Sequence, residues 1–185
     1  MDSEQQNILI VVDMQNDFVD GALGTEEAQA IVPYVAEKIR QFEGPVLFTQ
    51  DTHEKNYLET TEGRHLPVEH CIRGTDGWKV ISALEPFIEE APIEKETFGS
   101  RDLIDRLLAM NDATPIASVT LIGLCTDICV ISNALMIKAY LPEIDIIVDA
   151  RGCAGVTPES HRTALDAMKM CHIEIEGEGS PEDLS

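Results

Sequence analysis

Four short apolar runs, separated by segments with helical periodicity, constrain the fold of this chain more than any other feature. The runs are residues 8–12 (ILIVV), 46–49 (VLFT), 119–124 (VTLIGL) and 145–149 (DIIVD). Continuous runs of this length, rich in Val and Ile, are typical of strands that are buried on both faces of a parallel sheet. We therefore expect four such strands, with helices covering the sheet.

Helical patterns and weaker strand signals occupy the segments between these runs. Ile31, Val35, Ile39 and Phe42 recur at helical spacing, and Pro33 is expected in the first turn of that helix. Further helices are expected at residues 78–90, 100–108 and 129–140 and from residue 157 onward, and short strands at 93–95 and 172–175. This alternation predicts a three-layer, Rossmann-like α/β fold, in which a mostly parallel six-stranded sheet has helices on both faces.

The composition fits one globular domain. The chain has 185 residues, of which 44% are hydrophobic, so it can bury a sizeable core. We expect a single domain over residues 1–175 and an acidic, flexible tail at 176–185. No apolar run approaches the ~20 residues that span a bilayer, and residues 1–7 are too polar and acidic for a signal peptide.

Charge and cysteine content narrow the classes of partner and compartment. The formal net charge of −21, from 34 acidic against 13 basic residues, argues against nucleic acid and anionic membranes as partners. The five cysteines are an odd number without the spacing of a small disulfide scaffold. A reducing, cytoplasmic location is therefore the simplest expectation.

Polar side chains stand where the predicted strands end. Asp13 follows the first run, Asp51 follows the second, the segment CTDIC (125–129) follows the third, and Asp149 ends the fourth. Because ligands of parallel sheets bind beyond the carboxyl ends of the strands, we expect the functional site at this edge.

Cys129 is a candidate nucleophile. If a helix begins near Cys129, its unpaired N–H groups and positive dipole end favour a thiolate, and the same N–H groups could hold an oxyanion. Asp13 could accept the thiol proton, and Lys95, at another predicted strand end, could supply the cation that a buried carboxylate requires. The alternative is that Cys125 and Cys129 are small core residues and that Lys95 is a solvated surface lysine.

Residues 50–77 carry no clear periodicity and contain three of the five histidines. A structureless loop of this length is uncommon unless it has a function. Asp51 and His53 point the same way in extended chain, so both could bind one metal ion, with His70 as the third ligand and His65 as a competitor. Two imidazoles and one carboxylate suit zinc, iron or manganese.

Three motifs resemble the signatures of the isochorismatase-like cysteine hydrolases, and within that superfamily the likeness is greatest to nicotinamidases and related amidases. The motifs are DMQNDF (13–18), KETFGS (95–100) and GLCTDICV (123–130), and the resemblance extends from about residue 8 to residue 175. It implies a catalytic triad of Asp13, Lys95 and Cys129. It also implies a metal site at Asp51, His53 and His70, for which zinc is the expected metal.

The resemblance assigns roles to further residues around the third motif. It implies a cis peptide bond between Leu124 and Cys125, with the backbone N–H groups of Cys125 and Cys129 forming an oxyanion hole. Phe18 matches an aromatic residue that flanks the substrate ring, and Leu124 is expected in the substrate site as well. Asp127 is expected to cap the start of the helix.

The chain departs from the family pattern before the third metal ligand. Nicotinamidases often have Trp-Pro-x-His-Cys there, whereas this chain has LPVEHC at residues 66–71, without the aromatic residue and with one residue more. Trp78, the only tryptophan, lies nearby in the sequence, although a core role is the simpler expectation. The identity of the substrate therefore stays open.

The resemblance implies a hydrolase that cleaves the C–N bond of a small primary amide through a thioester, with nicotinamide as the best single candidate. N-carbamoyl compounds and ureides are alternative substrates of the same machinery. A zinc-binding or thiol-redox protein without hydrolase activity and a non-catalytic binding module are rival hypotheses. A homo-oligomer, either dimer or tetramer, is also expected, and a role in NAD salvage would follow from nicotinamide as substrate.

Overall fold

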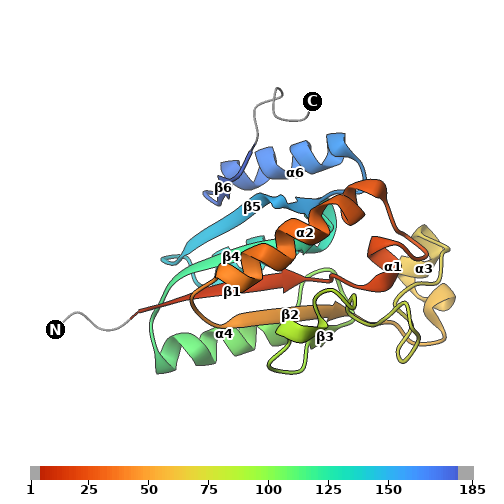
Figure 1. Cartoon of the computed structure of the whole chain (residues 1–185), viewed down its shortest axis with the longest axis horizontal. Coiled ribbons are helices and arrows are strands. Elements are labelled where there is room, and N and C mark those ends of the chain that lie inside the picture. The colour runs from red at the N-terminus through yellow and green to blue at the C-terminus, as the bar shows by residue number, and fades with distance from the viewer. Residues whose placement is uncertain (1–4, 179–185) are drawn as a thin grey trace.

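The computed structural model describes residues 5–178 and contains a six-stranded sheet in which all neighbouring strands are parallel. The strand order is β3-β2-β1-β4-β5-β6. The strands are β1 (Gln6–Val12), β2 (Val46–Asp51), β3 (Ile93–Lys95), β4 (Ile116–Leu124), β5 (Asp145–Ala154) and β6 (Glu174–Glu176). Because all the strands run the same way, their carboxyl ends meet at one edge of the sheet (Figure 1).

The central strand β1 shows why both faces of the sheet must be covered. Ile8, Ile10 and Val12 belong to the hydrophobic core on one face, whereas Leu9 and Val11 belong to the core on the other. All five side chains are completely buried. A strand that is apolar on both sides of its pleat is stable only between two layers of helix or loop.

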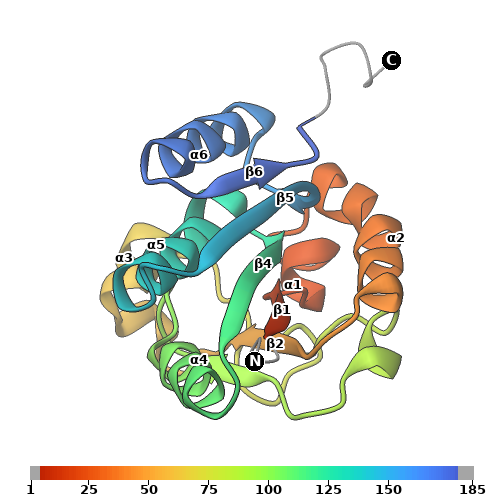
Figure 2. The same cartoon turned by 90° about the vertical axis from the view of Figure 1, so that its left-hand side faces the viewer.

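Helices cover both faces of the sheet, as Figure 2 shows from the end of the strands. One face is covered by α2 (Glu26–Gln41) and the segment 80–88, and the other by α4 (Arg101–Ala113), α5 (Ile131–Tyr140) and α6 (Pro158–Met170). Two short helices, α1 (Asn16–Val19) and α3 (Thr61–His65), lie beyond the carboxyl ends of the strands (Figure 1). The predicted three-layer α/β fold is confirmed.

Helix α2 begins earlier than the apolar pattern suggests, and placing Pro33 in its first turn was wrong. The side chain of Thr25 caps the helix by accepting a 3.0 Å hydrogen bond from the N–H of Ala28. Pro33 consequently lies inside the helix. The first turn carries the exposed residues Glu26 and Glu27, so the apolar periodicity gives no sign of it.

The helix expected over residues 78–90 is reduced to a single 3₁₀ turn at Glu85–Phe87, so that prediction was wrong. The N–H of Ile81 donates to the carbonyl oxygen of Met14, outside this segment. Ile81 and Leu84 are buried against the sheet. Backbone hydrogen bonds to the segment after β1 therefore replace the helical turn that the apolar spacing suggested.

The region of residues 50–77 is more regular than expected. It contains a 3₁₀ turn at Tyr57–Glu59 and helix α3, whose first residues are capped by the side chain of Thr60. Tyr57, the first residue of the 3₁₀ turn, is completely buried. Elements of three and five residues are too short to show a helical period in the sequence, which is why only a loop was expected.

The C-terminal strands differ in length from their predictions. β5 continues to Ala154, past a shift in its register with β4, and β6 occupies Glu174–Glu176 rather than 172–175. The expected flexible tail begins inside β6, and its residues 179–185 lie outside the described part of the chain. Within residues 5–178, no helix is long and apolar enough to cross a membrane.

Gly123 in β4 provides a test of how closely the central strands approach. Its φ of +117° disfavours any L side chain, and an added Cβ would lie 2.1 Å from the carbonyl oxygen of Val12. We expect Gly123→Ala to lower the free energy of unfolding by roughly 3 kcal/mol in urea denaturation. Gly74→Ala is the matched control, since Gly74 has a φ of +80° but open space around an added Cβ, and should cost about 1 kcal/mol. Equal losses in the two variants would contradict this account.

Candidate active site

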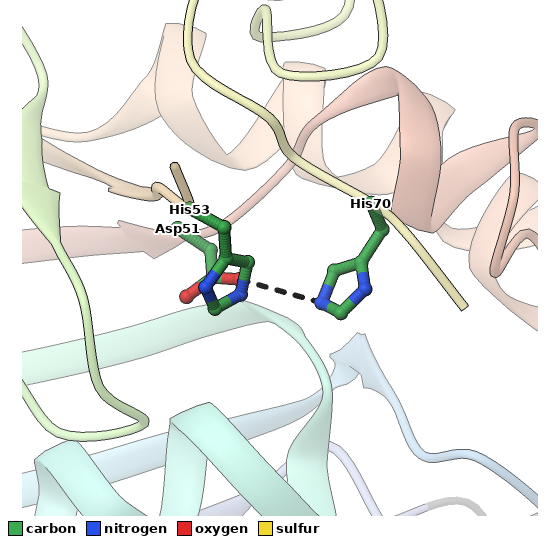
Figure 3. A group of neighbouring side chains, drawn as sticks. All are labelled: Asp51, His53 and His70. Atoms are coloured by element: carbon green, nitrogen blue, oxygen red, sulfur yellow. Dashed lines mark ion pairs between the residues drawn. The ribbon is translucent and has the colours of Figure 1, made fainter. Parts of the chain in front are cut away.

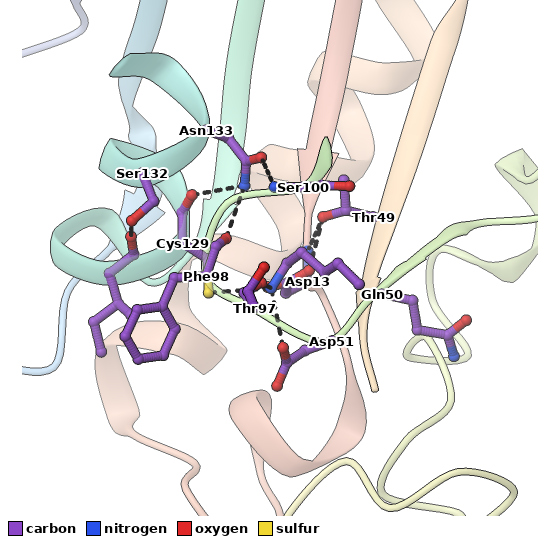
Figure 4. Close-up of polar contacts among 12 residues, drawn as sticks. Asp13, Thr49, Gln50, Asp51, Thr97, Phe98, Ser100, Cys129, Ser132 and Asn133 are labelled. Atoms are coloured by element: carbon purple, nitrogen blue, oxygen red, sulfur yellow. Dashed lines mark hydrogen bonds and ion pairs between the residues drawn. The ribbon is translucent and has the colours of Figure 1, made fainter. Parts of the chain in front are cut away.

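A buried lysine ammonium joins side chains from separate parts of the chain. Figure 4 labels three of its partners, Asp13, Asp51 and Cys129. Lys95 Nζ lies 2.7 Å from Asp13 Oδ2, 3.0 Å from Asp51 Oδ1 and 3.3 Å from Cys129 Sγ. The carbonyl oxygen of Thr97 accepts a further hydrogen bond from Nζ at 3.2 Å. Asp13, Asp51, Lys95 and Cys129 are all buried, with Cys129 the most exposed of them at 5%. The structure thus brings Asp13, Lys95 and Cys129 into one contact cluster.

The parallel sheet places these charged groups side by side. Asp51 is the last residue of β2, Lys95 is the last residue of β3, and the two are partners in the strand register. Asp13 directly follows β1 and has a left-handed backbone with φ of 49°. Thr49 Oγ1 donates a 2.7 Å hydrogen bond to Asp13 Oδ1. Three neighbouring strands end at the same edge of the sheet. Their ends therefore bring the charged groups of Asp13, Asp51 and Lys95 into contact.

Burial dominates the electrostatics of the cluster. It raises the pKa of Asp13, and Asp51 adds to this effect while Lys95 opposes it. Burial also raises the pKa of the Cys129 thiol well above its ordinary value, and the charge of Asp13 adds to it. Burial alone would lower the pKa of Lys95, but the charges of Asp13, the Cys129 thiolate and Asp51 outweigh it, and the pKa is raised well above its usual range. Lys95 therefore stays positive, while Asp13 and Cys129 compete for one proton.

Cys129 lies in a π-helical turn, Thr126–Val130, that precedes α5. The helix expected over residues 129–140 begins slightly earlier, because the helical segment begins at Thr126, and Cys129 lies in its first turn. The carbonyl oxygen of Cys125 accepts a 3.1 Å hydrogen bond from the N–H of Val130, which closes the turn. The peptide bond between Leu124 and Cys125 is cis, as the resemblance implied.

Two side chains of this turn are held by α6 and by the segment before it. Thr126 Oγ1 lies 2.7 Å from His161 Nδ1 on α6. The carboxylate of Asp127 accepts a hydrogen bond from the backbone N–H of Val156, with Oδ1 at 3.1 Å. Asp127 was expected to cap the start of the helix, and this prediction was wrong. Its side chain instead accepts a hydrogen bond from the backbone that follows β5.

Asn133 is a residue of the site that sequence reasoning missed. It lies on α5, one turn after Cys129, and is completely buried. Its Nδ2 donates a 2.8 Å hydrogen bond to the carbonyl oxygen of Cys129, and its Oδ1 accepts a 2.8 Å hydrogen bond from the N–H of Ser100. Asn133 thus ties the Cys129 turn to the start of α4. The available signal was an amide side chain inside an apolar helical run, since a buried amide needs partners.

A second cluster, formed by Asp51, His53 and His70, adjoins the first (Figure 3). One ligand atom from each residue lies within 4.8 Å of the other two. His70 Nδ1 lies 2.8 Å from the carbonyl oxygen of Val68, so Nδ1 is the donor and Nε2 is left with a free lone pair. His53 Nε2 is buried 2.9 Å from Asp51 Oδ2, yet it makes no hydrogen bond with the described residues. Nitrogen lone pairs facing a carboxylate oxygen fit a shared divalent cation.

Glu62 on α3 also faces this metal-site cluster, and sequence reasoning missed it. Its Oε1 lies 3.6 Å from His53 Nε2 and 3.8 Å from His70 Nε2. The short helix that presents Glu62 left no pattern in the sequence. His65, the competing third ligand, is exposed, and its Nδ1 bonds to the carbonyl oxygen of Thr61 instead. Of the two candidate histidines, the structure therefore places His70 in the cluster.

A cavity of about 770 Å³ opens onto both clusters. Cys125, Cys129 and the three residues of the metal-site cluster line it, and so do Phe18 and Leu124, the two residues expected in the substrate site. The rings of Phe18 and His70 have their centroids 5.5 Å apart. Trp78 lies outside the lining and donates its indole N–H to Thr52 Oγ1. The cavity is therefore the place where a substrate could meet the Cys129 thiol.

Comparison with known protein families and sequences gives consistent matches over nearly the whole chain. The model of the Isochorismatase domain matches residues 7–176. An uncharacterized isochorismatase family protein of Bacillus subtilis is 32% identical over 171 residues, which cover 85% of this chain and 91% of that protein. A nicotinamidase of Schizosaccharomyces pombe is 27% identical, with 94% of each chain covered.

Solved structures match at the level of the whole fold. A pyrazinamidase of Pyrococcus horikoshii in complex with zinc superimposes with a TM-score of 0.76 at 29% identity, covering 92% of this chain and 98% of that one. An N-carbamoylsarcosine amidase from Thermoplasma acidophilum gives a TM-score of 0.74 at 26% identity, covering 96% and 99% of the two chains. The same fold thus carries more than one named amidase activity.

Replacement of Lys95 tests whether its ammonium holds the cluster together. We expect Lys95→Ala to lower the free energy of unfolding by about 3–5 kcal/mol at neutral pH, because two buried carboxylates lose their cation. Lys79→Ala is the control, since Lys79 forms an exposed ion pair with Asp76 and should change the stability by less than about 0.5 kcal/mol. Urea denaturation of both variants measures the difference, and similar small losses would rule out the stabilising role of Lys95.

Proposed function

Because this chain belongs to the isochorismatase family, whose domain model matches residues 7–176, we propose that it is a cysteine-dependent amidohydrolase. The proposed reaction is cleavage of the C–N bond of a small primary amide, and nicotinamide, giving nicotinate and ammonia, is the best single candidate. The observation that carries the proposal is the contact of Lys95 with both Asp13 and Cys129 at the wall of a cavity. The similarity to a nicotinamidase supports the choice of substrate.

In the first half of the proposed reaction, Asp13 accepts the proton of the Cys129 thiol. The thiolate attacks the carbonyl carbon of the amide, and a C–S bond forms. The raised pKa of Asp13 suits it to keep the proton until the tetrahedral intermediate collapses. The C–N bond then breaks, Asp13 returns the proton to the leaving nitrogen, and ammonia departs from a thioester. Lys95, 3.3 Å from the sulfur, stabilises the negative charge while it resides on the thiolate.

We assign the oxyanion hole to the backbone N–H groups of Cys125 and Cys129. Cys125 precedes the helical turn between β4 and α5 and Cys129 lies in it, and the first N–H groups of a helical segment have no acceptor within the helix. Such groups can donate to the oxygen of a tetrahedral intermediate without any rearrangement of the protein. Asn133, which holds the carbonyl group of Cys129, fixes the orientation of this turn.

In the second half of the proposed reaction, a water molecule attacks the thioester. Asp13, ionised once ammonia has left, accepts a proton from that water while a C–O bond forms and the C–S bond breaks. The same proton then returns to the Cys129 sulfur. The carboxylic acid leaves and the thiol is restored, so no redox partner is consumed.

Asp51, His53 and His70 would hold a divalent metal ion, for which we propose zinc, with iron and manganese as alternatives. His53 Nε2, a buried atom that lacks a hydrogen-bond partner among the described residues, supports this assignment. So does the zinc in the similar pyrazinamidase structure. When bound, the ion would supply an electrophilic anchor for a ring nitrogen of the substrate.

An N-carbamoyl amino acid is the second candidate substrate, because an N-carbamoylsarcosine amidase shares the fold. Such a substrate carries a carboxylate. No Lys or Arg among the described residues lines the cavity, whereas Asp51, Glu62 and Glu96 do. A further anion would be costly to bury there without a cation, so the cavity favours an uncharged amide or ureide.

Three further parts of the proposal concern the protein as a whole. We propose that it works in the cytoplasm, where the five free cysteines would remain reduced. We also propose that it forms a homo-oligomer, a dimer or a tetramer, as the resemblance to the family implies. A role in NAD salvage follows if nicotinamide is the substrate.

Removal of the proposed nucleophile is the direct test of the reaction. We expect Cys129→Ala to lower kcat for ammonia release from nicotinamide by at least roughly 1,000-fold, because it removes the thiol that Lys95 contacts. Cys171→Ala is the control, since Cys171 is exposed and lies outside the cavity lining, and its activity should be unchanged. Ammonia is measured by a coupled assay. Retained turnover in Cys129→Ala would end the proposal.

Metal binding can be tested without an activity measurement. After dialysis against a chelator, we expect the protein to bind one zinc ion per chain in isothermal titration calorimetry. His53→Ala should weaken that binding by more than about 100-fold, because it removes a ligand rather than a supporting contact. His65→Ala should bind zinc as the wild type does, since His65 lies outside the cluster. Equal binding by both variants would exclude the assigned site.

A further inference from the structure

The cavity beside Cys129 is larger than a single-ring amide needs. Its volume is about 770 Å³, within the range of sites that enclose drug-sized ligands. Nicotinamide has nine non-hydrogen atoms. Even at the ~30 Å³ that one water molecule occupies in the liquid, nine atoms fill only roughly 270 Å³. More than half of the cavity would therefore stay empty of substrate.

The additional space is bordered by apolar side chains that are partly open to solvent. Leu66, Phe98 and Val156 line the cavity and remain 37%, 45% and 51% exposed. They come from three separate segments of the chain, so their meeting at one opening is a product of the fold. Large apolar side chains left exposed around a concave site mark a surface for an apolar ligand.

The charge of the lining disfavours a substrate extension that is anionic. The lining contains three carboxylates, Asp51, Glu62 and Glu96, and no Lys or Arg among the described residues. The proposed metal ion and Lys95 would offset the charge of Asp51, which leaves the carboxylates of Glu62 and Glu96. The part of the substrate that lies beyond the reacting amide must then be neutral and apolar.

We propose, resting on the amidase function proposed above, that the cavity accepts neutral primary amides carried by a fused two-ring aromatic system. The amide meets Cys129, and the second ring contacts Leu66, Phe98 and Val156. By the same measure of ~30 Å³ per atom, the thirteen non-hydrogen atoms of quinoline-3-carboxamide need roughly 390 Å³, which the cavity holds. The bonds made and broken are those already described, and the products are ammonia and quinoline-3-carboxylate.

The wild-type enzyme, loaded with zinc, gives the first test. Release of ammonia from nicotinamide and from quinoline-3-carboxamide is compared as kcat/KM. We expect the two-ring amide to be hydrolysed at least as efficiently as nicotinamide, because its second ring adds contacts to the apolar lining. Hydrolysis of nicotinamide with a lower kcat/KM for the two-ring amide would overturn this inference alone. Absence of ammonia from both amides would instead overturn the amidase function.

A matched pair of variants tests which side chains set the limit of size. Leu66→Trp fills the cavity opening, whereas Leu135→Trp makes the same change at a leucine of α5 that is 38% exposed and lies outside the lining. We expect Leu66→Trp to lower kcat/KM for quinoline-3-carboxamide by more than about tenfold and that for nicotinamide by less than about threefold. Leu135→Trp should change neither value. Equal effects of Leu66→Trp on both amides would contradict the assignment, and if this variant does not fold, the wild-type comparison still decides.

Discussion

The buried ammonium of Lys95 is the interaction on which the rest of the site depends. Asp13 and Asp51 are both buried, and each carboxylate would be costly to hold there alone. Lys95 contacts both, at 2.7 and 3.0 Å, and it reaches the sulfur of Cys129 as well. The carboxyl ends of β1, β2 and β3 can therefore carry charge into the interior only because one cation serves all of them. The sequence motif around Lys95 is thus a condition for the fold at this edge as well as for the proposed chemistry.

Asp51 connects the two halves of the site. One of its oxygens contacts Lys95, and the other lies 2.9 Å from His53 Nε2 and 3.7 Å from His70 Nε2. A cation held by the histidines would draw negative charge from the carboxylate that also faces Lys95. The proposed metal site and the proposed nucleophile are therefore electrostatically coupled through a single side chain. A change of charge at the metal site alters the electrostatic environment of the nucleophile.

Sequence reasoning succeeded where a feature is local and regular. The continuous apolar runs predicted the buried strands, and the rule that ligands bind beyond the carboxyl ends of parallel strands predicted where Asp13 and Asp51 would lie. It failed at short or irregular elements. The segment 78–90 has helical spacing, yet it pairs its backbone with residues near Met14, and α3 is too short to show a period. Glu62 was missed because the five-residue helix that presents it leaves no pattern in the sequence, and Asn133 because Ser100, the residue that it joins to the Cys129 turn, lies 33 residues away along the chain.

The sequence by itself determined the class of fold and the residue types that could react, because strand runs, helix caps and the three motifs act over a few neighbouring residues. Only the tertiary structure decided the strand order, which places β3 beside β2 and so pairs Lys95 with Asp51. It also selected His70 over His65, placed Cys129 inside a π-helical turn and set the volume of the cavity. These properties depend on register and on packing between segments that are distant in the chain, and local patterns carry no information on either.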